Sequence, residues 1–327
     1  MRFPPFITPG TLAVVALVLT LWAGAFLVPI PTQREPLRVA VPMWAGAESL
    51  IMARNANELN SEEVNLVEMN WTSAAMRAVG NKVVDAAVLS LDEVIRQIGQ
   101  GYPLKVIMVL DISKGADLLV AKPEIKSVAD LKGARIGYEP RTSGSWLLGQ
   151  ALENSKLKLG DVAQVPLNPA EVEEIFHELS LDAVVLAEPW RQRLTSMNLK
   201  TLYDSSRPGA AIVRVLAVHP EAVKDHRDTL LDLLRAQLKW SRRLADGRVD
   251  MTAILRREGV SKEVFQNIRN QLEVVDIDRN LKLLRRDDPW LAELFTRLQN
   301  SLSEQDESAG RLNVEEVFDA SLLEELK

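Results

Sequence analysis

The chain has 327 residues, of which 47% are hydrophobic and 26% charged, a balance that is typical of a globular protein and excludes a disordered or collagen-like chain. Its formal net charge is −6 at pH 7 and its 39 Lys and Arg residues are scattered, so no nucleic acid is expected as a partner. The absence of cysteine excludes disulfides, thiolate metal sites, a cysteine nucleophile and a lipidated N-terminal cysteine.

The N-terminal segment differs in composition from the rest of the chain. After a tail at residues 1–10, residues 11–30 contain no charged side chain. About 20 such residues are enough for a helix to cross a bilayer. Because this stretch is longer than the roughly 7 to 15 apolar residues of a signal peptide, we expect a retained membrane anchor, with a signal peptide cleaved near residues 23–25 as the alternative. Residues 31–36 form a proline-containing spacer, and the bulk of the chain lies outside the cytoplasmic membrane in both cases.

From residue 37 onward, short apolar runs alternate with helical patterns. In the first block we expect strands at 37–41, 64–69, 84–89 and 104–110, and helices at 47–59, 74–79 and 91–98. Such an alternation predicts an α/β sheet with mostly parallel strands.

A second block of the same kind follows. We expect strands at 118–121, 134–138, 162–167 and 182–187, helices at 143–154 and 169–179, and a capping box at 127–130. A strand at 211–218 then returns to the first block. The remainder is mostly helical, with helices around 230–238, 261–272 and 289–302 and a solvated loop at 303–310.

The chain passes between the two blocks twice, near residues 113–117 and 206–209. Two blocks that are joined by two crossings predict a hinged, two-lobe α/β protein. Lobe 1 is expected to comprise residues 37–116 and 207–327, and lobe 2 residues 117–206.

Five pieces of the sequence, in their order and spacing, resemble the periplasmic solute-binding proteins of ABC importers. They are VPMWAGAESLIMAR at 41–54, the strand from Asp85 to Ser90, SVADLKGARIG at 127–137, the turn at 142–145 and LDAVVLAEPW at 181–190. The similarity is to the NMT1/THI5-like branch, which handles nitrate, taurine, aliphatic sulfonates and thiamine-pyrimidine precursors. The chain departs from that branch in lacking a lipid-anchoring cysteine and at residues 57–60, where relatives often have a glycine.

This resemblance implies a two-lobe fold of the type II periplasmic-binding-protein class, with a small-molecule ligand between the lobes and an ABC permease as partner. It also implies a location at the periplasmic face of the inner membrane, anchored through residues 11–30, or in the soluble periplasm after cleavage. A second role for the same hinge is a membrane-anchored sensor that reports ligand occupancy to a membrane signalling protein.

Two expected strand ends of the first block carry candidate ligand-binding residues. Ligands of open α/β sheets collect beyond the carboxyl ends of the strands. Trp44 offers an aromatic face after the first strand, with a simple role in filling the core as the alternative, and Gly46 allows close approach of the backbone. Ser90 follows a later strand, where its hydroxyl can meet an anion or a carbonyl, or act as a plain N-cap.

The strongest anion-binding signal lies in the second block, between a strand and a helix. Thr142, Ser143 and Ser145 combine hydroxyls, free N–H groups and the positive end of a helix dipole. A purely structural cap is the alternative for these residues.

Acidic residues near the same strand ends complicate a simple anion site. Asp111 and Asp117 flank the first crossing, Glu139 precedes the turn at 142–145, and Glu188 ends a strand just before Trp190. An unpaired carboxylate in a closing cleft is costly. If two of these carboxylates face the cleft, we therefore expect a ligand with an amine or another donor, and nitrate is disfavoured. The alternative for each of them is a solvated or capping residue.

Enzymatic motifs are incomplete in this sequence. Gly144 and Gly149 have P-loop spacing, but Gln150 stands where the lysine belongs, and the HExxH-like start at His177 lacks its second histidine. We expect no catalytic residue, cofactor or metal, although a cysteine-independent enzyme on the same fold, such as a dehydratase, is an alternative. The sequence therefore predicts an extracytoplasmic solute-binding protein that captures a small polar organic ligand, such as a sulfonate, an amine or a pyrimidine-like compound.

Overall fold

The computed structural model describes residues 10, 13–14, 18, 20, 35–305 and 312–327. The chain divides into two units, residues 1–35 and 36–327, and the architecture below is that of the second unit. Within the described residues, no helix combines the length and the apolar character needed to cross a membrane. Most of the anchor or signal segment expected at residues 11–30 lies outside the described residues.

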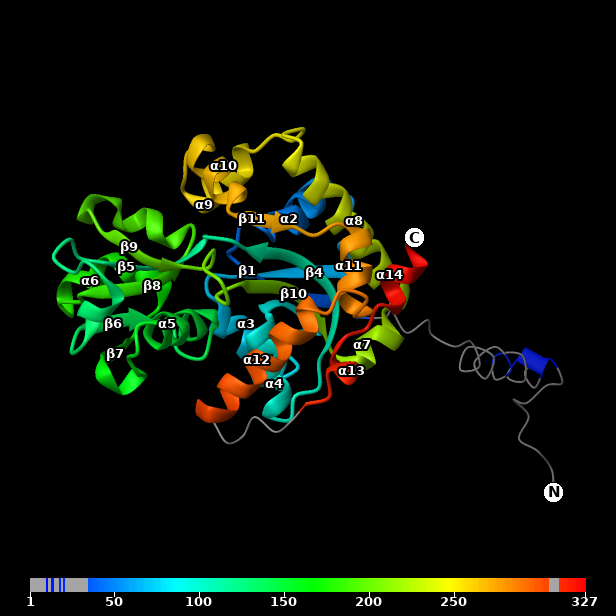
Figure 1. Ribbon diagram of the computed structural model, residues 1–327. Coiled ribbons are helices and arrows are strands. Elements are labelled where there is room, and N and C mark those ends of the chain that lie inside the picture. The colour runs from blue at the N-terminus through cyan, green and yellow to red at the C-terminus, as the bar shows by residue number, and fades with distance from the viewer. Residues whose placement is uncertain (1–9, 11–12, 15–17, 19, 21–34, 306–311) are drawn as a thin grey trace, which may run out of the picture. The chain divides into compact units, whose positions relative to one another are not determined.

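A six-stranded sheet forms the first lobe, in the order β11-β4-β10-β3-β1-β2 (Figure 1). Its strands are β1 Leu37–Pro42, β2 Val64–Met69, β3 Ala86–Ser90, β4 Lys105–Ser113, β10 Ile212–Val218 and β11 Leu272–Val274. β10 lies in the middle of the sheet and all its residues are buried, which explains why its sequence is almost continuously apolar.

Helices cover both faces of this sheet (Figure 1). They are α2 Glu48–Asn55, α3 Thr72–Gly80, α4 Leu91–Gly99, α7 Pro220–Asp225, α8 Arg227–Ala245, α9 Thr252–Glu258, α10 Lys262–Asn270, α11 Ile277–Leu284, α12 Trp290–Gln305, α13 Val314–Val317 and α14 Ser321–Glu325. In α8, which covers the helix expected around 230–238, Leu230, Leu233 and Leu234 are buried, so the apolar face of this helix packs into the core.

A five-stranded sheet forms the second lobe, in the order β7-β6-β8-β5-β9. Its strands are β5 Asp117–Ala121, β6 Arg135–Tyr138, β7 Ala163–Pro166, β8 Ala183–Ala187 and β9 Lys200–Asp204. Its helical segments are α5 Ser143–Asn154, α6 Val172–Glu178 and the short turns η1 Val128–Leu131, η2 Leu159–Asp161, η3 Pro169–Glu171 and η4 Trp190–Met197. The expected capping box is present, because the Asp130 carboxylate accepts hydrogen bonds from the backbone and the hydroxyl of Ser127.

Most strands run in the same direction within their sheet, as expected: β1–β4 do so in the first sheet and β6–β9 in the second. The sheets are nevertheless mixed, because β10 and β11 in the first sheet and β5 in the second run in the opposite direction. β10 runs antiparallel to both of its neighbours, β3 and β4, and β5 runs antiparallel to β8 and β9. β10 enters its sheet from the other lobe, and β5 follows β4 directly across the crossing. Neither strand is preceded by a crossover helix that would make it parallel.

Several of the expected helical segments also end differently, α10 and α12 among them. The stretch expected as one helix at 261–272 is α10 followed by the edge strand β11, and α12 extends through residues 303–305, which were expected to be loop. β11 pairs with β4, so tertiary pairing overrides the helical pattern at the end of that stretch.

The two crossings lie side by side. β4 ends at Ser113 before β5 begins at Asp117, and β9 ends at Asp204 before β10 begins at Ile212. The hydroxyl of Ser205 lies 2.8 Å from that of Ser113 and accepts a hydrogen bond of 2.8 Å from the Gly115 N–H. The first sheet thus contains β1–β4, β10 and β11, and the second contains β5–β9. The exact lobe limits, between residues 116 and 117 and between residues 206 and 207, stay a prediction.

Candidate ligand-binding site

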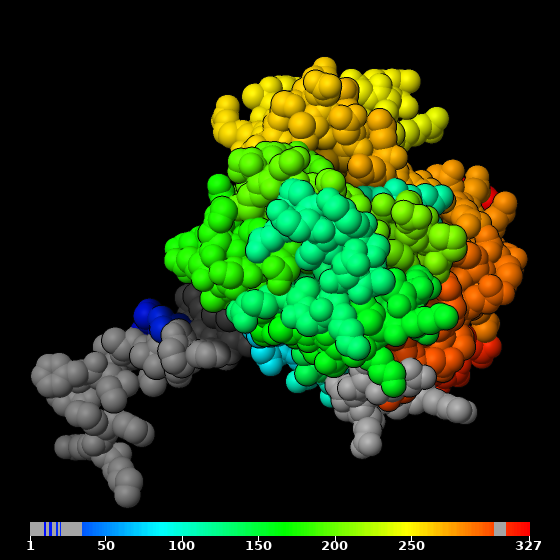
Figure 2. Space-filling model, turned by 60° about the vertical axis from the view of Figure 1, so that its left-hand side comes forward, coloured from blue at the N-terminus to red at the C-terminus, as the bar shows by residue number. Residues whose placement is uncertain are grey.

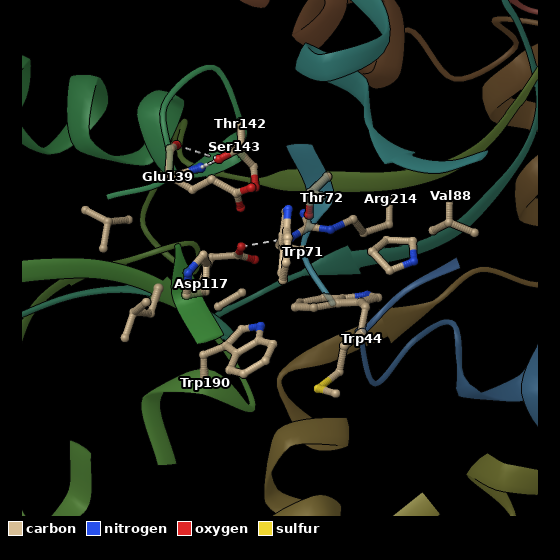
Figure 3. A pocket seen from close by; sticks show the side chains of 17 residues that line it. Trp44, Trp71, Thr72, Val88, Asp117, Glu139, Thr142, Ser143, Trp190 and Arg214 are labelled. Atoms are coloured by element: carbon tan, nitrogen blue, oxygen red, sulfur yellow. Dashed lines mark hydrogen bonds and ion pairs between the residues drawn. The ribbon is translucent and has the colours of Figure 1, made fainter. Parts of the chain in front are cut away.

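A cavity of about 50 Å³ lies between the two lobes (Figure 3). Six of the ten residues expected at the site line it, namely Trp44, Asp117, Glu139, Thr142, Ser143 and Trp190. Other residues that line it are Pro42, Met43, Trp71, Thr72, Val88, Gly144, Pro169, Val185, Leu186, Ala187 and Arg214. Residues of both sheets therefore line the cavity, which lies where the strands β1, β3, β6 and β8 end.

Arg214 is the central charged residue of this cavity. It interrupts the otherwise apolar strand β10, where it is aligned with Ser90 of β3 on one side and Asp111 of β4 on the other. Its Nη2 donates a hydrogen bond of 2.9 Å to Asp117 Oδ1 of the second lobe, and both side chains are buried. The guanidinium carbon also lies 4.2 Å from the centre of the Trp44 ring. Figure 3 shows this ion pair, with Trp71 beside it and Trp190 near Asp117.

Trp44 is fixed in place by a buried carboxylate. Its Nε1 donates a hydrogen bond of 2.9 Å to Asp111 Oδ2, and Asp111 is completely buried. Burial raises the pKa of Asp111 to about 6, although the positive charge of Arg214 acts in the opposite direction. Gly46 does not line the cavity. A Cβ atom at this position would lie 1.8 Å from Asp111 Oδ2, so the glycine makes room for the Trp44–Asp111 hydrogen bond.

The start of α5, the expected anion site, is already occupied by a carboxylate from the first lobe. The Ser143 N–H donates a hydrogen bond of 3.1 Å to Glu93 Oε1, and the Ser90 N–H donates one of 2.7 Å to Glu93 Oε2. Glu93 is 1% exposed, and burial together with the negative charge of Asp92 raises its pKa to about 7. A protein carboxylate thus takes the position at the positive end of α5 that the sequence suggested for an anionic ligand.

The hydroxyls of Thr142 and Ser145 in the same turn form hydrogen bonds with nearby backbone groups. Thr142 Oγ1 accepts a hydrogen bond of 3.3 Å from the Gly144 N–H and donates one of 2.9 Å to the Glu139 carbonyl. Ser145 Oγ accepts a hydrogen bond of 2.8 Å from the Arg141 N–H, and Ser145 does not line the cavity. Thr142 is thus the N-cap of α5, and Ser145 lies in the first turn of the helix and bonds the loop that precedes it.

Glu139 makes a similar contact in the opposite direction, from the second lobe to a helix of the first lobe. Its Oε1 accepts a hydrogen bond of 2.9 Å from the Ser73 N–H in the first turn of α3. Burial raises the pKa of Glu139, while the hydrogen bonds from Ser73 act in the opposite direction. Each lobe therefore places one carboxylate at the start of a helix in the other lobe.

Two other predicted residues lie away from the cavity. Ser90 is completely buried and acts as the N-cap of α4, with its hydroxyl donating a hydrogen bond of 2.6 Å to Asp92. Glu188 accepts two hydrogen bonds from Gln192 Nε2, at 2.9 and 3.0 Å, and burial raises its pKa. Glu188 lines a separate groove between η4 and α10, and Figure 2 shows the second lobe, in green, adjoining the α9–α10 segment above it.

Sequence reasoning missed Trp71, Arg214 and Glu93. Arg214 had a usable signal, because a single charge within an apolar strand must find a buried partner. Glu93 had one as well, since Ser90 and Glu93 have the spacing of a capping box. Trp71 had no distinctive signal beyond its position shortly after a strand end. Within the described part of the chain, no group of three or more His, Asp or Glu residues is placed to hold a metal ion.

Comparison with known proteins agrees with this architecture. The model of the NMT1-like family matches residues 31–254. The chain belongs to the NMT1-like family. A protein of Brucella abortus (strain 2308) that is named as a binding protein is 34% identical over 120 residues, which are 33% of this chain and 38% of that protein. A protein of Escherichia coli (strain K12), named for binding aliphatic sulfonates, is 31% identical over 114 residues, or 34% of this chain and 36% of the relative. The matches thus span less than two fifths of these curated relatives.

Solved structures extend the similarity to the whole fold. The alkanesulfonate-binding protein SsuA from Xanthomonas axonopodis pv. citri, bound to MOPS, matches with a TM-score of 0.69 and 16% identity over 86% of this chain and 96% of that one. A ligand-binding component of an ABC-type import system from Staphylococcus aureus matches with a TM-score of 0.72 and 16% identity over 90% and 99%. The desulfurization enzyme DSZB matches with a TM-score of 0.61 and 14% identity over 88% and 98%. The fold is therefore the two-sheet α/β fold of periplasmic binding proteins, as expected.

Proposed function

We propose that this NMT1-like protein is an extracytoplasmic solute-binding protein that captures a small polar organic ligand between its lobes for an ABC importer. The observation that carries the proposal is the interlobe cavity and its two unsatisfied polar atoms. Arg214 Nη1 and Asp117 Oδ2 are buried and have no hydrogen-bond partner among the described residues. Unsatisfied buried polar atoms are costly, and a ligand that supplied their partners would gain that free energy on binding.

The chemistry of these atoms supports the expected class of ligand. The free N–H of Arg214 would donate to an oxygen or nitrogen of the ligand, and the free oxygen of Asp117 would accept from an amine or hydroxyl. The aromatic rings of Trp44, Trp71 and Trp190 supply the apolar walls. A sulfonate, an amine or a pyrimidine-like compound can each use part of this set, whereas nitrate has no donor for Asp117.

Capture requires the lobes to separate. The cavity of about 50 Å³ is far smaller than the roughly 300 to 1,000 Å³ of typical ligand pockets, so a ligand enters only through an opened cleft. The paired crossings at Ser113 and Ser205 are the proposed hinge.

The partner and the location belong to the same proposal. An ABC permease at the periplasmic face of the inner membrane is the proposed partner, with residues 11–30 as the proposed tether. The sulfonate-binding relatives and structural neighbours support this role more than signalling or catalysis. DSZB has the same fold, so the absence of catalysis is itself a proposal.

The test measures binding and closure together on the full-length chain. We expect one ligand per chain by isothermal titration calorimetry, in a library of sulfonates, amines and pyrimidines, with a smaller radius of gyration in small-angle X-ray scattering. Arg214→Met should abolish binding, whereas the exposed Arg235→Met on α8 should not change it. Stoichiometric binding with unchanged dimensions, or turnover of the bound compound, would contradict the proposal.

A further inference from the structure

We propose that the ligand is a compact organic cation, whose charged nitrogen lies among Trp44, Trp71 and Trp190 beside Asp117. This inference rests on the proposed solute-binding function and narrows its ligand class. In this proposal the cleft recognises the cationic nitrogen of the ligand and not a sulfonate group. The argument has three steps, which concern the aromatic walls, the charge balance and the two helix starts.

Two of the three tryptophans already have an arginine side chain over their rings, Arg214 inside the cavity and the exposed Arg193 outside it. The guanidinium carbon of Arg214 lies 4.2 Å from the centre of the Trp44 ring, and that of Arg193 lies 4.8 Å from the centre of the Trp190 ring. The face of an indole ring attracts cations electrostatically, more strongly when water is excluded. Trp71 also lines the cavity. A ligand cation would meet the same kind of surface.

The charge balance around the cavity favours positive charge. Carboxylates in and directly behind its walls are Asp92, Glu93, Asp111, Asp117 and Glu139, whereas the guanidinium groups facing them are Arg77, Arg96, Arg214 and Arg269. Of these cations only Arg96 and Arg214 are buried, whereas all of these carboxylates except Glu139 are buried. Burial makes ionisation of Glu93, Asp111 and Glu139 costly and raises the pKa of each, and the nearby guanidinium groups act in the opposite direction without cancelling this rise. An added cation would reduce this cost.

The groups that could receive an anion are already engaged. The start of α5 is bonded to Glu93 and the start of α3 to Glu139. Arg214 shares its charge with Asp117, so its free Nη1 suits a neutral acceptor such as a hydroxyl better than a full anion. The free Asp117 Oδ2, in contrast, is a buried carboxylate oxygen without a partner among the described residues. A small ammonium compound with a neighbouring hydroxyl satisfies both atoms.

The test uses probes that share a two-carbon skeleton and differ in charge: choline and ethanolamine as cations, taurine as a zwitterion and isethionate as an anion. With the full-length chain at pH 7.5, we expect choline or ethanolamine to bind at least about tenfold (about 1.4 kcal/mol) more tightly than taurine, because both are cations that carry no anionic group, and we expect isethionate to bind most weakly. Tighter binding of isethionate or taurine, with lobe closure, would overturn the cation class and leave the proposed function intact. If none of the four probes binds, the cation class is also overturned. If, in addition, no compound of the wider library closes the lobes, the proposed function is overturned as well.

Variants identify the residues that recognise the cation. We expect Asp117→Asn to weaken the cationic probe by about tenfold or more, and Trp190→Leu to weaken it more than Trp190→Phe, which keeps an aromatic face. Trp240→Leu is the matched control, because Trp240 on α8 also has an arginine over its ring and donates to a glutamate, but lies outside the cleft. Circular dichroism of each variant checks folding. Equal affinity in Trp190→Leu and Trp240→Leu, with both folded, would contradict the aromatic site.

Discussion

The two carboxylates that cross the cleft make the same type of contact in opposite directions, but in different surroundings. Glu93 lies on a helix of the first lobe, is almost completely buried and accepts N–H groups from both lobes. Glu139 lies in a loop of the second lobe, is only half-buried and accepts the Ser73 N–H of the first lobe.

This difference suggests different roles for the two carboxylates, one within its own lobe and one in closure of the lobes. The Ser90 N–H bond comes from the lobe that contains Glu93, so it fixes this carboxylate before the lobes meet. The contact between Glu139 and Ser73 exists only when the lobes are together, and water can replace it when they part. We therefore expect Glu93 to govern stability and Glu139 to govern the population of the closed form.

The largest expected effect is a dependence of stability on pH through Glu93. Its pKa is raised from 4.5 to about 7, so the folded state binds more protons than the unfolded state between these values. The free energy of unfolding should therefore fall as the pH rises from about 4.5 to about 7, by about 3 kcal/mol from this group, and change no further above that range. Asp111, raised from 3.8 to about 6, adds a change of the same sign at lower pH.

Urea unfolding at pH 5, 6, 7 and 8 measures this dependence. Glu93→Gln should flatten it, because an amide cannot ionise, whereas the exposed Glu153→Gln on α5 should leave it unchanged. A pH profile that is the same in the wild type and Glu93→Gln would show that Glu93 ionises normally in the folded protein.

Truncation of the two carboxylates should separate them further. Glu93→Ala removes the capping box of α4 together with the bond to Ser143, and we expect it to lower the free energy of unfolding at pH 5 by about 1–2 kcal/mol. Glu139→Ala should lower it by less than about 0.5 kcal/mol, as is usual for substitutions away from the buried interior. Equal losses in the two variants, measured by urea unfolding, would remove the distinction between them.

Much of the fold follows from local patterns, while the site depends on long-range pairing. Apolar periodicity and capping residues predict α5 with its observed ends, and the two crossings follow from where the blocks change. The antiparallel directions of β5 and β10 could not be predicted, because strand direction depends on which sheet a crossing strand joins.

The site shows the same division. Trp44 and Asp117 were expected from strand ends, and they do line the cavity. The occupation of the α5 start by Glu93 was not expected, since it joins residues that are 50 positions apart in the sequence and belong to different lobes. Local sequence identifies the acceptor and the helix start separately, but only the packing of the lobes brings them together.

A smaller effect tests which group caps α5. Thr142 is its N-cap residue, and Thr142→Ala should lower the free energy of unfolding by about 1 kcal/mol, whereas Thr142→Ser keeps the hydroxyl and should cost less. Because Glu93 bonds a neighbouring N–H at the same helix start, the loss from Thr142→Ala should be larger in a Glu93→Ala background. Strict additivity in this double-mutant cycle, measured by urea unfolding, would mean that the two caps act independently.

The smallest expected effect is that of Glu139→Gln on closure. The amide oxygen still accepts the Ser73 N–H, so only the charge assistance is lost, and a charge-assisted hydrogen bond is roughly twice as strong as a neutral one. Since Glu139 is half-buried, this amounts to about 0.5 kcal/mol, or roughly a twofold decrease in the ratio of closed to open molecules. The absence of native cysteine allows unique spin labels at the exposed positions Glu62 and Lys132, one on each lobe, and the distance distribution between them reports this ratio directly. Glu139→Ala should decrease the ratio further. If both variants keep the wild-type distribution while Glu93→Gln broadens it, Glu93 rather than Glu139 controls closure.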